Sequence, residues 1–127
     1  MHLVDCSRSK VINNYVEGAD DAIGCDAYFL KCGDNLISGN TIKQVFRCIN
    51  PVTGLYYTNY MHSAAAVYVG TGEASQYAVI TNVIVSNNQI IGGATSGGGL
   101  HVRMAAVTNL VAENILFEGN TLSGLNN

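Results

Sequence analysis

The sequence predicts an all-β protein, and three observations lead to this prediction. Val and Ile together number 23 against 9 Leu, and β-branched side chains fit the pleated surface of a strand. Asn and Gly number 14 each, and both residues suit turns that need a positive φ. Apolar residues alternate over short runs, whereas a helical spacing is hard to find anywhere in the chain.

The length and charge of the chain limit what it can be. At 127 residues it is long enough for one domain but not for two, so we expect a single domain over residues 1–127. Hydrophobic residues make up 48% and charged residues 12%, a composition that argues against disorder. The net charge of −3 argues against nucleic acid or anionic lipid as a partner. No membrane span is expected, because no apolar run approaches the roughly 20 residues that a membrane helix needs.

A repeated Asn phrase divides the chain. ILFEGNTLSG (115–124) has a near copy in LISGNTI (36–42) and a looser one in VIVSNNQIIG (83–92). Apolar residues recur three positions before the Asn and two positions after it. The aligned residues are Asn14, Asn40, Asn88 and Asn120, with Asn59 as a weaker fifth copy. The intervals of 26, 19, 29 and 32 residues each match one coil of a solenoid, which predicts about five coils.

A second strand is expected in each coil, after the Asn phrase. Its four copies are AIGC (22–25), VFRC (45–48), AVYV (66–69) and GLHV (99–102). Alternation along these strands turns the second residue of each copy inward and the third outward. The outward residues are then Gly24, Arg47, Tyr68 and His101.

The same alignment stacks the cysteines in two inward columns. It places Cys6 beside Cys32, and Cys25 beside Cys48, on neighbouring strands about 4.8 Å apart. That spacing is within reach of a disulfide, but the interpretation we favour is free thiols that pack as small hydrophobic groups. The cysteines show none of the CxxC spacings of zinc or redox sites, and no metal ligands are predicted.

Two solenoids compete for this pattern. VIVSNNQI (83–90) also fits the string of a leucine-rich repeat, whose period partly overlaps the one observed. However, Val and Ile outnumber Leu, and a second strand in each coil leaves no place for a helix. A parallel β-helix is therefore favoured. In that fold the Asn would lie at the bend between two strands in a left-handed backbone conformation, and stacked Asn side chains would form a hydrogen-bonded ladder.

The ends of the repeat predict a larger assembly. The first phrase begins a few residues into the chain, and the last is followed only by Leu-Asn-Asn. An open coil exposes unpaired backbone and apolar core, which solenoids normally cap. We therefore expect a piece of a longer chain, or a subunit that buries its ends in neighbours.

The carboxylates of GADDAIGCD (18–26) are the first candidate site. Asp20 and Asp21 are adjacent at a turn that enters a strand, and two crowded carboxylates can take the protonated and ionised roles of glycoside hydrolysis. The alternative is that both are turn residues that accept hydrogen bonds from backbone N–H groups.

The Asn phrases on coils of this length resemble the right-handed parallel β-helix superfamily, which includes pectate lyases, polygalacturonases and phage tailspike depolymerases. VINNYVEGADDAIG (11–24) is similar to the stretch of polygalacturonase-type hydrolases that ends in Gly-Asp-Asp-Cys-Ile. The resemblance implies that Asp20 is the general acid and that Asp21 helps to activate water. The Asn-Thr-Asp and His-Gly motifs of those hydrolases have no counterpart in this sequence, and only Arg103 matches their Arg-x-Lys motif.

The outward row of the second strand is the other candidate site. Arg47, Tyr68 and His101 lie on it, with Asp26 and Arg103 one step along, and together they would line a groove that binds an acidic polysaccharide. Lyases of the superfamily remove a proton with a basic residue, often beside calcium, so a calcium ion is expected only if this chain is a lyase. The alternative is a solvated sheet face with scattered polar residues.

The resemblance implies a segment that binds polysaccharide and cleaves it as a hydrolase or lyase, as tailspikes and extracellular polysaccharide-degrading enzymes do. It also implies an extracellular or virion-associated location, although MHLVDCSRSK (1–10) lacks the apolar stretch of a signal peptide. Tailspikes are trimers, so a homotrimer or a longer parent chain would cover the ends. The competing hypothesis is a non-catalytic structural or adhesin module.

Overall fold

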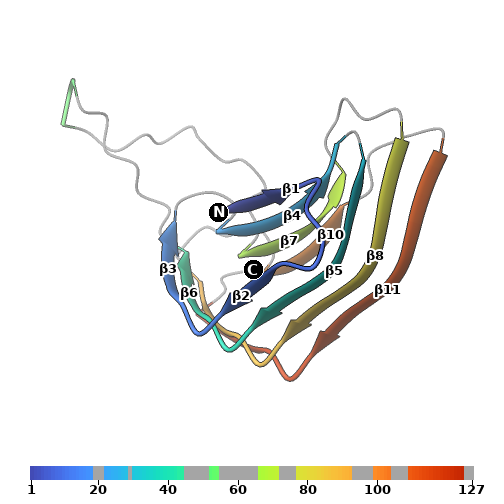
Figure 1. Ribbon diagram of the computed structural model, residues 1–127. Helices are drawn as coiled ribbons and strands as arrows, with labels where there is room; N and C mark the ends of the chain where they lie inside the picture. The colour runs from blue at the N-terminus through green and yellow to red at the C-terminus, as the bar shows by residue number, and fades with distance from the viewer. Residues whose placement is uncertain are drawn as a thin grey trace.

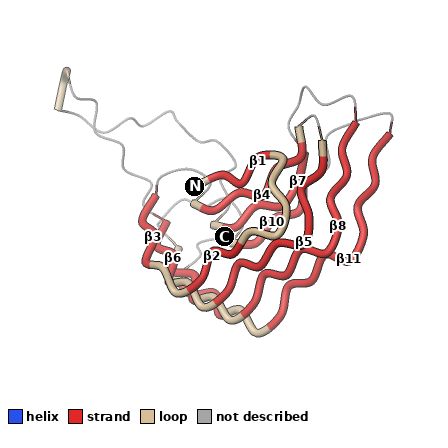
Figure 2. Tube along the Cα trace, viewed as in Figure 1, coloured by secondary structure: helices blue, strands red, loops and turns tan. Residues whose placement is uncertain are grey.

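The protein is built from parallel β-strands. The computed structural model describes residues 1–18, 22–28, 30–44, 52–54, 66–71, 77–92, 99–103 and 109–124 (Figure 1). Within these ranges every regular element is a strand and none is a helix (Figure 2), and all the strand pairings are parallel. The prediction of an all-β protein is confirmed. The described residues also form no helix that is long and apolar enough to cross a membrane.

The twelve strands form three four-stranded sheets. Sheet A contains β1 (His2–Val4), β4 (Ile23–Ala27), β7 (Val67–Thr71) and β10 (Leu100–Arg103). Sheet B contains β2 (Lys10–Ile12), β5 (Lys31–Ser38), β8 (Tyr77–Ser86) and β11 (Asn109–Glu118). Sheet C contains β3 (Tyr15–Gly18), β6 (Thr41–Gln44), β9 (Gln89–Ile91) and β12 (Thr121–Ser123). The chain therefore passes through sheets A, B and C in the same order four times. We call each pass through the three sheets a round.

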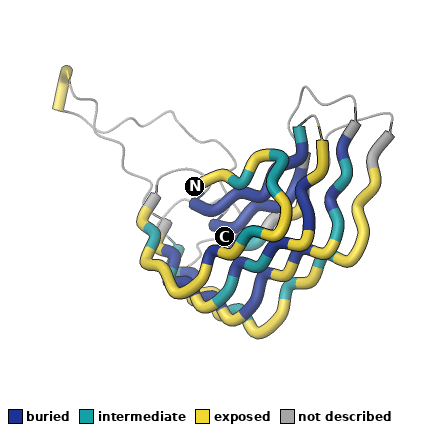
Figure 3. Tube along the Cα trace, viewed as in Figure 1, coloured by how far each residue is buried: buried dark blue, intermediate teal, exposed yellow. Residues whose placement is uncertain are grey.

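The strand register confirms the apolar columns predicted on either side of the Asn phrase. In sheet B, Ile37 pairs with Val11 and with Val85, and Phe117 follows in the fourth round. In sheet C the corresponding column is Val16, Ile42, Ile90 and Leu122. In the two middle rounds the side chains of these columns are fully buried. They belong to the core between the sheets, and another round covers them on either side. Figure 3 shows the change from these buried rounds to the exposed strand β11.

The described strands form four rounds rather than the five coils expected. Strand β7 pairs directly with β4, with Val67 opposite Ile23, and Asn40 donates directly to Asn88. No coil built on Asn59 therefore lies between the second and third rounds. Asn59 and VFRC (45–48), including Phe46 and Cys48, are outside the described residues. The fifth repeat was the least regular one in the sequence.

The cysteine pairing differs from the expected one. Cys25 lies between Leu3 and Val69 in the register of sheet A, and the predicted neighbour Cys48 is outside the described residues. Cys25 instead forms a disulfide with Cys32 of sheet B, across the interior of the same round, with their Cα atoms 6.7 Å apart. The prediction of free thiols is therefore wrong for these two residues. Cys6 does lie beside Cys32, since the Gly33 N–H donates to the Cys6 carbonyl, and its thiol is free.

The corner between sheets B and C also differs in one detail from the expectation. The residue with positive φ is not the repeated Asn but the residue before it. This column reads Asn13 (φ 56°), Gly39 (φ 66°), Asn87 (φ 53°) and Gly119 (φ 60°). Asn and Gly are the two residues that adopt this conformation at the lowest cost. The repeated Asn is thus free to turn its side chain into the ladder.

Candidate functional site on the outer face of sheet A

Two rows of outward positions cross sheet A, and they carry most of the predicted binding residues. One row runs from His2 through Gly24 and Tyr68 to His101, so that Tyr68 and His101 are neighbours. The second row runs through Val4, Asp26, Gly70 and Arg103, in that order. Asp26 and Arg103 therefore share a row, with Gly70 between them.

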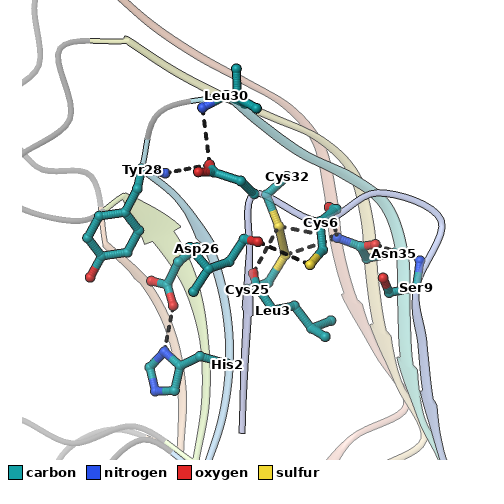
Figure 4. Close-up of a disulfide and its surroundings, with 12 residues drawn as sticks. His2, Leu3, Cys6, Ser9, Cys25, Asp26, Tyr28, Leu30, Cys32 and Asn35 are labelled. Atoms are coloured by element: carbon teal, nitrogen blue, oxygen red, sulfur yellow. Dashed lines mark hydrogen bonds and ion pairs between the residues drawn. A yellow bond between two sulfur atoms is a disulfide. The ribbon is translucent and has the colours of Figure 1, made fainter.

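His2 and Asp26 form the best-defined polar pair on this face. The His2 Nδ1 lies 2.6 Å from the Asp26 Oδ2, and Figure 4 shows the imidazole ring turned toward this carboxylate. The His2 side chain is 44% exposed, whereas that of Asp26 is 3% exposed. A carboxylate with so little water around it interacts strongly with its partner, because the local dielectric is low. Asp26 therefore holds the His2 ring in one orientation.

Gly24 allows the pair to form. A Cβ atom on Gly24 would lie 2.6 Å from the His2 Nδ1 and 3.1 Å from the Asp26 Oδ2. Any larger residue would therefore displace the imidazole from its position over β4. His2 was not among the residues predicted from the sequence. In the register HLV (2–4) corresponds to HVR (101–103), with Leu3 and Val102 in one column, and this short similarity was the sequence signal for His2.

Asp5 fixes the end of β4 next to this pair. Its backbone N–H donates to the Asp26 carbonyl at 2.9 Å, and its Oδ1 accepts from the N–H groups of Tyr28 at 2.8 Å and Leu30 at 3.1 Å. Asp5 has φ of 48°, a conformation that Asp tolerates better than most residues. The segment that leaves sheet A is thereby tied to the first round.

The disulfide lies beneath this face, inside the second round. Figure 4 shows Asn35 pointing at it from β5. The Asn35 Nδ2 donates to the Cys25 Sγ at 3.3 Å, to the Cys32 Sγ at 3.2 Å and to the Cys6 carbonyl at 3.0 Å, while its Oδ1 accepts from the Ser9 N–H at 2.9 Å. Asn35 is 2% exposed, so these bonds satisfy a polar group that would otherwise be costly to bury. The first two rounds are therefore joined by polar contacts as well as by the sheets.

The remaining predicted site residues are located only in part. Asp20, Asp21 and Arg47 lie outside the described residues. His101 and Arg103 are placed by the backbone of β10, at the register positions given above. Tyr68 is 6% exposed and Asp26 is 2% exposed, so the outer face of sheet A is not the solvated surface of the alternative interpretation at these two positions.

This arrangement has a limited set of chemical abilities. An imidazole oriented by a buried carboxylate can accept or donate a proton, or donate a hydrogen bond to a bound oxygen. Within the described residues, no three His, Cys, Asp or Glu side chains are grouped so that they could hold a metal ion. No protein-family model, curated protein or solved structure matches this chain.

Proposed function

We propose that the chain is a segment of a carbohydrate-active, right-handed parallel β-helix protein that binds an acidic polysaccharide along the outer face of sheet A. Support for this fold comes from the three parallel sheets visited in the same order four times. Support for the binding role comes from one observation, the register that aligns His2, Tyr68 and His101 in one row and Asp26 and Arg103 in the next.

The rows suit a chain of uronate sugars. Residues in successive rounds lie about 4.8 Å apart, a spacing that lets one sugar unit contact more than one round. Arg103 would pair with a uronate carboxylate, because guanidinium and carboxylate groups form strong two-point contacts. His2, held by Asp26, would donate a hydrogen bond to a sugar hydroxyl, and His101 would do so from the far end of its row.

Cleavage would use Asp20 and Asp21, which Ala22 separates in the sequence from the start of β4 at Ile23. In a hydrolase, Asp20 would protonate the leaving oxygen and Asp21 would help to activate water. In a lyase, His101 would take the proton next to the uronate carboxyl, and the freed electron pair would form a carbon–carbon double bond as the bond to the glycosidic oxygen breaks. A calcium ion would neutralise the carboxylate during this step. A homotrimer or a longer parent chain, on a virion or outside a cell, is the setting we propose for this activity.

Binding is tested first with the 127-residue chain and a panel of acidic and neutral polysaccharides, by isothermal titration calorimetry. Arg103→Ala is expected to weaken binding to acidic chains about tenfold, the effect of losing a charge-assisted contact. Lys43→Ala, which removes a cation from the exposed face of sheet C, is the matched control and is expected to bind normally. Equal losses in both variants would contradict a site on sheet A.

Cleavage is tested on the same panel by two assays, release of reducing ends and appearance of unsaturated uronates. Asp20→Ala and Asp21→Ala are expected to abolish hydrolysis while leaving the calorimetric affinity unchanged. Activity that survives both substitutions would exclude this pair as catalytic residues.

The second candidate function is a non-catalytic structural or adhesin module. The observation in its favour is the burial of Asp26 and Tyr68, since two of the residues selected for sugar contact have little surface to offer. Binding without cleavage on every polysaccharide would favour an adhesin, and the absence of both would favour a structural module.

A further inference from the structure

The four repeated Asn residues, Asn14, Asn40, Asn88 and Asn120, form a ladder with a direction. We call it the inner ladder. In each step the backbone N–H and the Nδ2 of one Asn both donate to the Oδ1 of the Asn in the next round, over distances of 2.9–3.1 Å. Within the described residues, no donor reaches the Oδ1 of Asn14 and no acceptor faces the backbone N–H of Asn120. One end of the ladder thus presents an acceptor and the other a donor.

A second ladder runs the opposite way on the surface of sheet B. We call Asp34, Asn82 and Asn114 the outer ladder. Asn82 Nδ2 donates to Asp34 Oδ1 at 2.8 Å, and Asn114 Nδ2 donates to Asn82 Oδ1 at 3.0 Å. Asn114 thus ends the ladder with an acceptor, since its Oδ1 receives no donor from the described part of the chain. The first round has Arg8 at the same left-handed position, and a guanidinium carries only donors.

The residues with positive φ at the corner between sheets B and C also follow a pattern that the first round of a second copy would continue. It alternates as Asn13, Gly39, Asn87 and Gly119, and the Asn side chain occupies the space where a Cβ on the following Gly would be. The alternation repeats every two rounds. After Gly119 the next residue in phase is an Asn, and the first round begins with one.

The apolar columns are incomplete at the fourth round. Leu122 and Val102 are each 42% exposed, although their register partners Ile90 and Val69 are fully buried. On the first round, Leu3 and Val16 continue the same two columns and are only partly buried. The exposed charges of sheet B also differ between the two rounds, with Glu113 and Glu118 on β11, and Arg8 and Lys10 just before and at the start of β2.

We infer that the chain binds a second copy of itself head to tail, with the β10–β12 round of one copy seated on the β1–β3 round of the next. The contact continues all three sheets. It joins Asn120 to the partner's Asn14 in the inner ladder and Asn114 to the partner's Arg8 in the outer one. Because the two surfaces differ, each copy keeps one surface open, and the assembly grows as a filament rather than closing as a dimer. This inference does not depend on the proposed binding of polysaccharide, and it is an alternative to the homotrimer or longer parent chain as the cover for the two end rounds.

Assembly of the 127-residue chain is tested first, by measuring its mass with sedimentation velocity over a wide range of concentrations. The expected result is a weight-average mass that rises with concentration and passes the dimer mass without a plateau. A monomer at every concentration would overturn the inference, and so would a mass that levels off at a closed dimer or trimer.

The direction of the contact is tested with a blocked variant for each surface. Leu122→Lys places a charge in the apolar column of the fourth round, and Val16→Lys does so in the first round. Each variant alone is expected to stay monomeric, and an equimolar mixture is expected to form a dimer with one copy of each, because each keeps one working surface. If Val16→Lys self-associates alone while Leu122→Lys does not, two fourth rounds meet each other and the inference is wrong.

Two matched controls carry the same charge on the outside of the same strands. Tyr15→Lys and Thr121→Lys replace exposed residues that neighbour Val16 and Leu122 in sequence, and both are expected to assemble like the unchanged chain. If far-UV circular dichroism shows that Val16→Lys does not fold, Arg8→Glu replaces it, since Arg8 is exposed. Arg8→Glu is expected to weaken assembly at least tenfold, and an unchanged assembly curve would overturn the Arg8 contact.

Discussion

The inner and outer ladders use the same side-chain chemistry in opposite surroundings. Their amide hydrogen bonds have similar lengths, 2.9–3.1 Å in the inner ladder and 2.8–3.0 Å in the outer one. However, Asn40 and Asn88 are each 1% exposed, whereas Asp34, Asn82 and Asn114 are exposed. The inner amides from the second round onward also donate to backbone carbonyls of the preceding round, such as that of Val11.

The difference teaches that bond length alone does not indicate stabilisation. A group that loses its partner on the surface gains water in exchange, whereas a buried group that loses its partner stays unpaired. We therefore expect the inner ladder to stabilise the fold strongly and the outer ladder to do so weakly.

The largest expected effect is that of Asn40→Ala. The substitution leaves the N–H of Asn14 and the carbonyl of Val11 without the Asn40 side chain. The Oδ1 of Asn88 loses one of its two donors and keeps the backbone N–H of residue 40. At about 1–3 kcal/mol for each of these two unpaired groups, we expect a loss of about 2–4 kcal/mol in the free energy of unfolding, measured by urea denaturation. A loss below about 1 kcal/mol would remove the contrast between the two ladders.

Gly39→Ala tests the corner that presents the inner ladder. Gly39 has φ of 66°, and a Cβ there would collide with the Oδ1 of Asn13. We expect a loss of about 2–3 kcal/mol, from the left-handed backbone and the displaced Asn13 side chain together. Gly54→Ala is the matched control, because Gly54 has φ of 68° with no atom within 4 Å of a Cβ, and it should lose only about 1 kcal/mol. Equal losses in the two variants would show that the collision is relieved without cost.

Asn35→Val tests a buried amide that belongs to neither ladder. Val83 and Ile115 occupy the same column in later rounds, so Val fits the space. The Ser9 N–H and the Cys6 carbonyl lose their side-chain partner, and we expect a loss of about 2 kcal/mol in urea denaturation. A variant as stable as the parent would mean that water or the thiol of Cys6 replaces these bonds.

Asn82→Ala removes the middle of the outer ladder. Its partners, Asp34 and Asn114, are exposed and regain water, so we expect a loss of less than about 1 kcal/mol on the same denaturation assay. Asn82 also has φ of 54°, so Asn82→Gly separates the backbone cost from the lost bonds. A loss that matches that of Asn40→Ala would contradict the role we assign to burial.

The smallest expected effect concerns another exposed hydrogen bond. The hydroxyl of Tyr15 donates to Glu17 at 3.0 Å, and this bond, with desolvation and the charge of Glu17, raises the pKa of Tyr15 above 10.0. Because the folded pKa lies above the unfolded one, the bond stabilises the fold at neutral pH, and this contribution disappears as the pH rises through the raised pKa. Glu17→Ala should lower the pKa toward its ordinary value in an NMR titration of the Tyr15 ring, while Glu118→Ala should not. A pKa that stays raised in Glu17→Ala would show that Glu17 is not its cause.

The sequence was sufficient to predict the inner ladder and the apolar columns on either side of it, because the same positions recur around each Asn. Val11, Ile37 and Val85 needed only the alternation of a strand to be placed inward. The pairing of Cys25 with Cys32 was not predictable in this way. It crosses the interior between two sheets of one round, and an alignment of rounds compares only residues that lie above one another. The left-handed residue was misplaced by one position for a related reason, since Asn and Gly both occur in the phrase and both tolerate positive φ.

Less of the candidate site than of the fold could be predicted from the sequence. The outward row was predicted as Gly24, Arg47, Tyr68 and His101, with Asp26 and Arg103 one step along. The register places Tyr68 beside His101, and Asp26 in one row with Arg103. It also places Gly24 directly beside Tyr68, and Arg47 lies outside the described residues. His2 was missed because a residue so close to the start of the chain has little sequence pattern around it. Its role depends on the absence of a side chain at Gly24, and a sequence does not show which residue will lie over a glycine.

The connection between Gln44 and Val67 has a practical consequence. Asn40 and Asn88 are 48 residues apart, whereas the other ladder steps span 26 and 32 residues, yet the hydrogen bonds between them are both 2.9 Å long. Each doubling of a connection costs only about 0.6 kcal/mol in closure entropy. A foreign peptide grafted into residues 45–65 should therefore be displayed at one corner without any change in the strand register. If the chain also assembles head to tail, the graft would recur at a fixed interval along the filament, as a regularly spaced array.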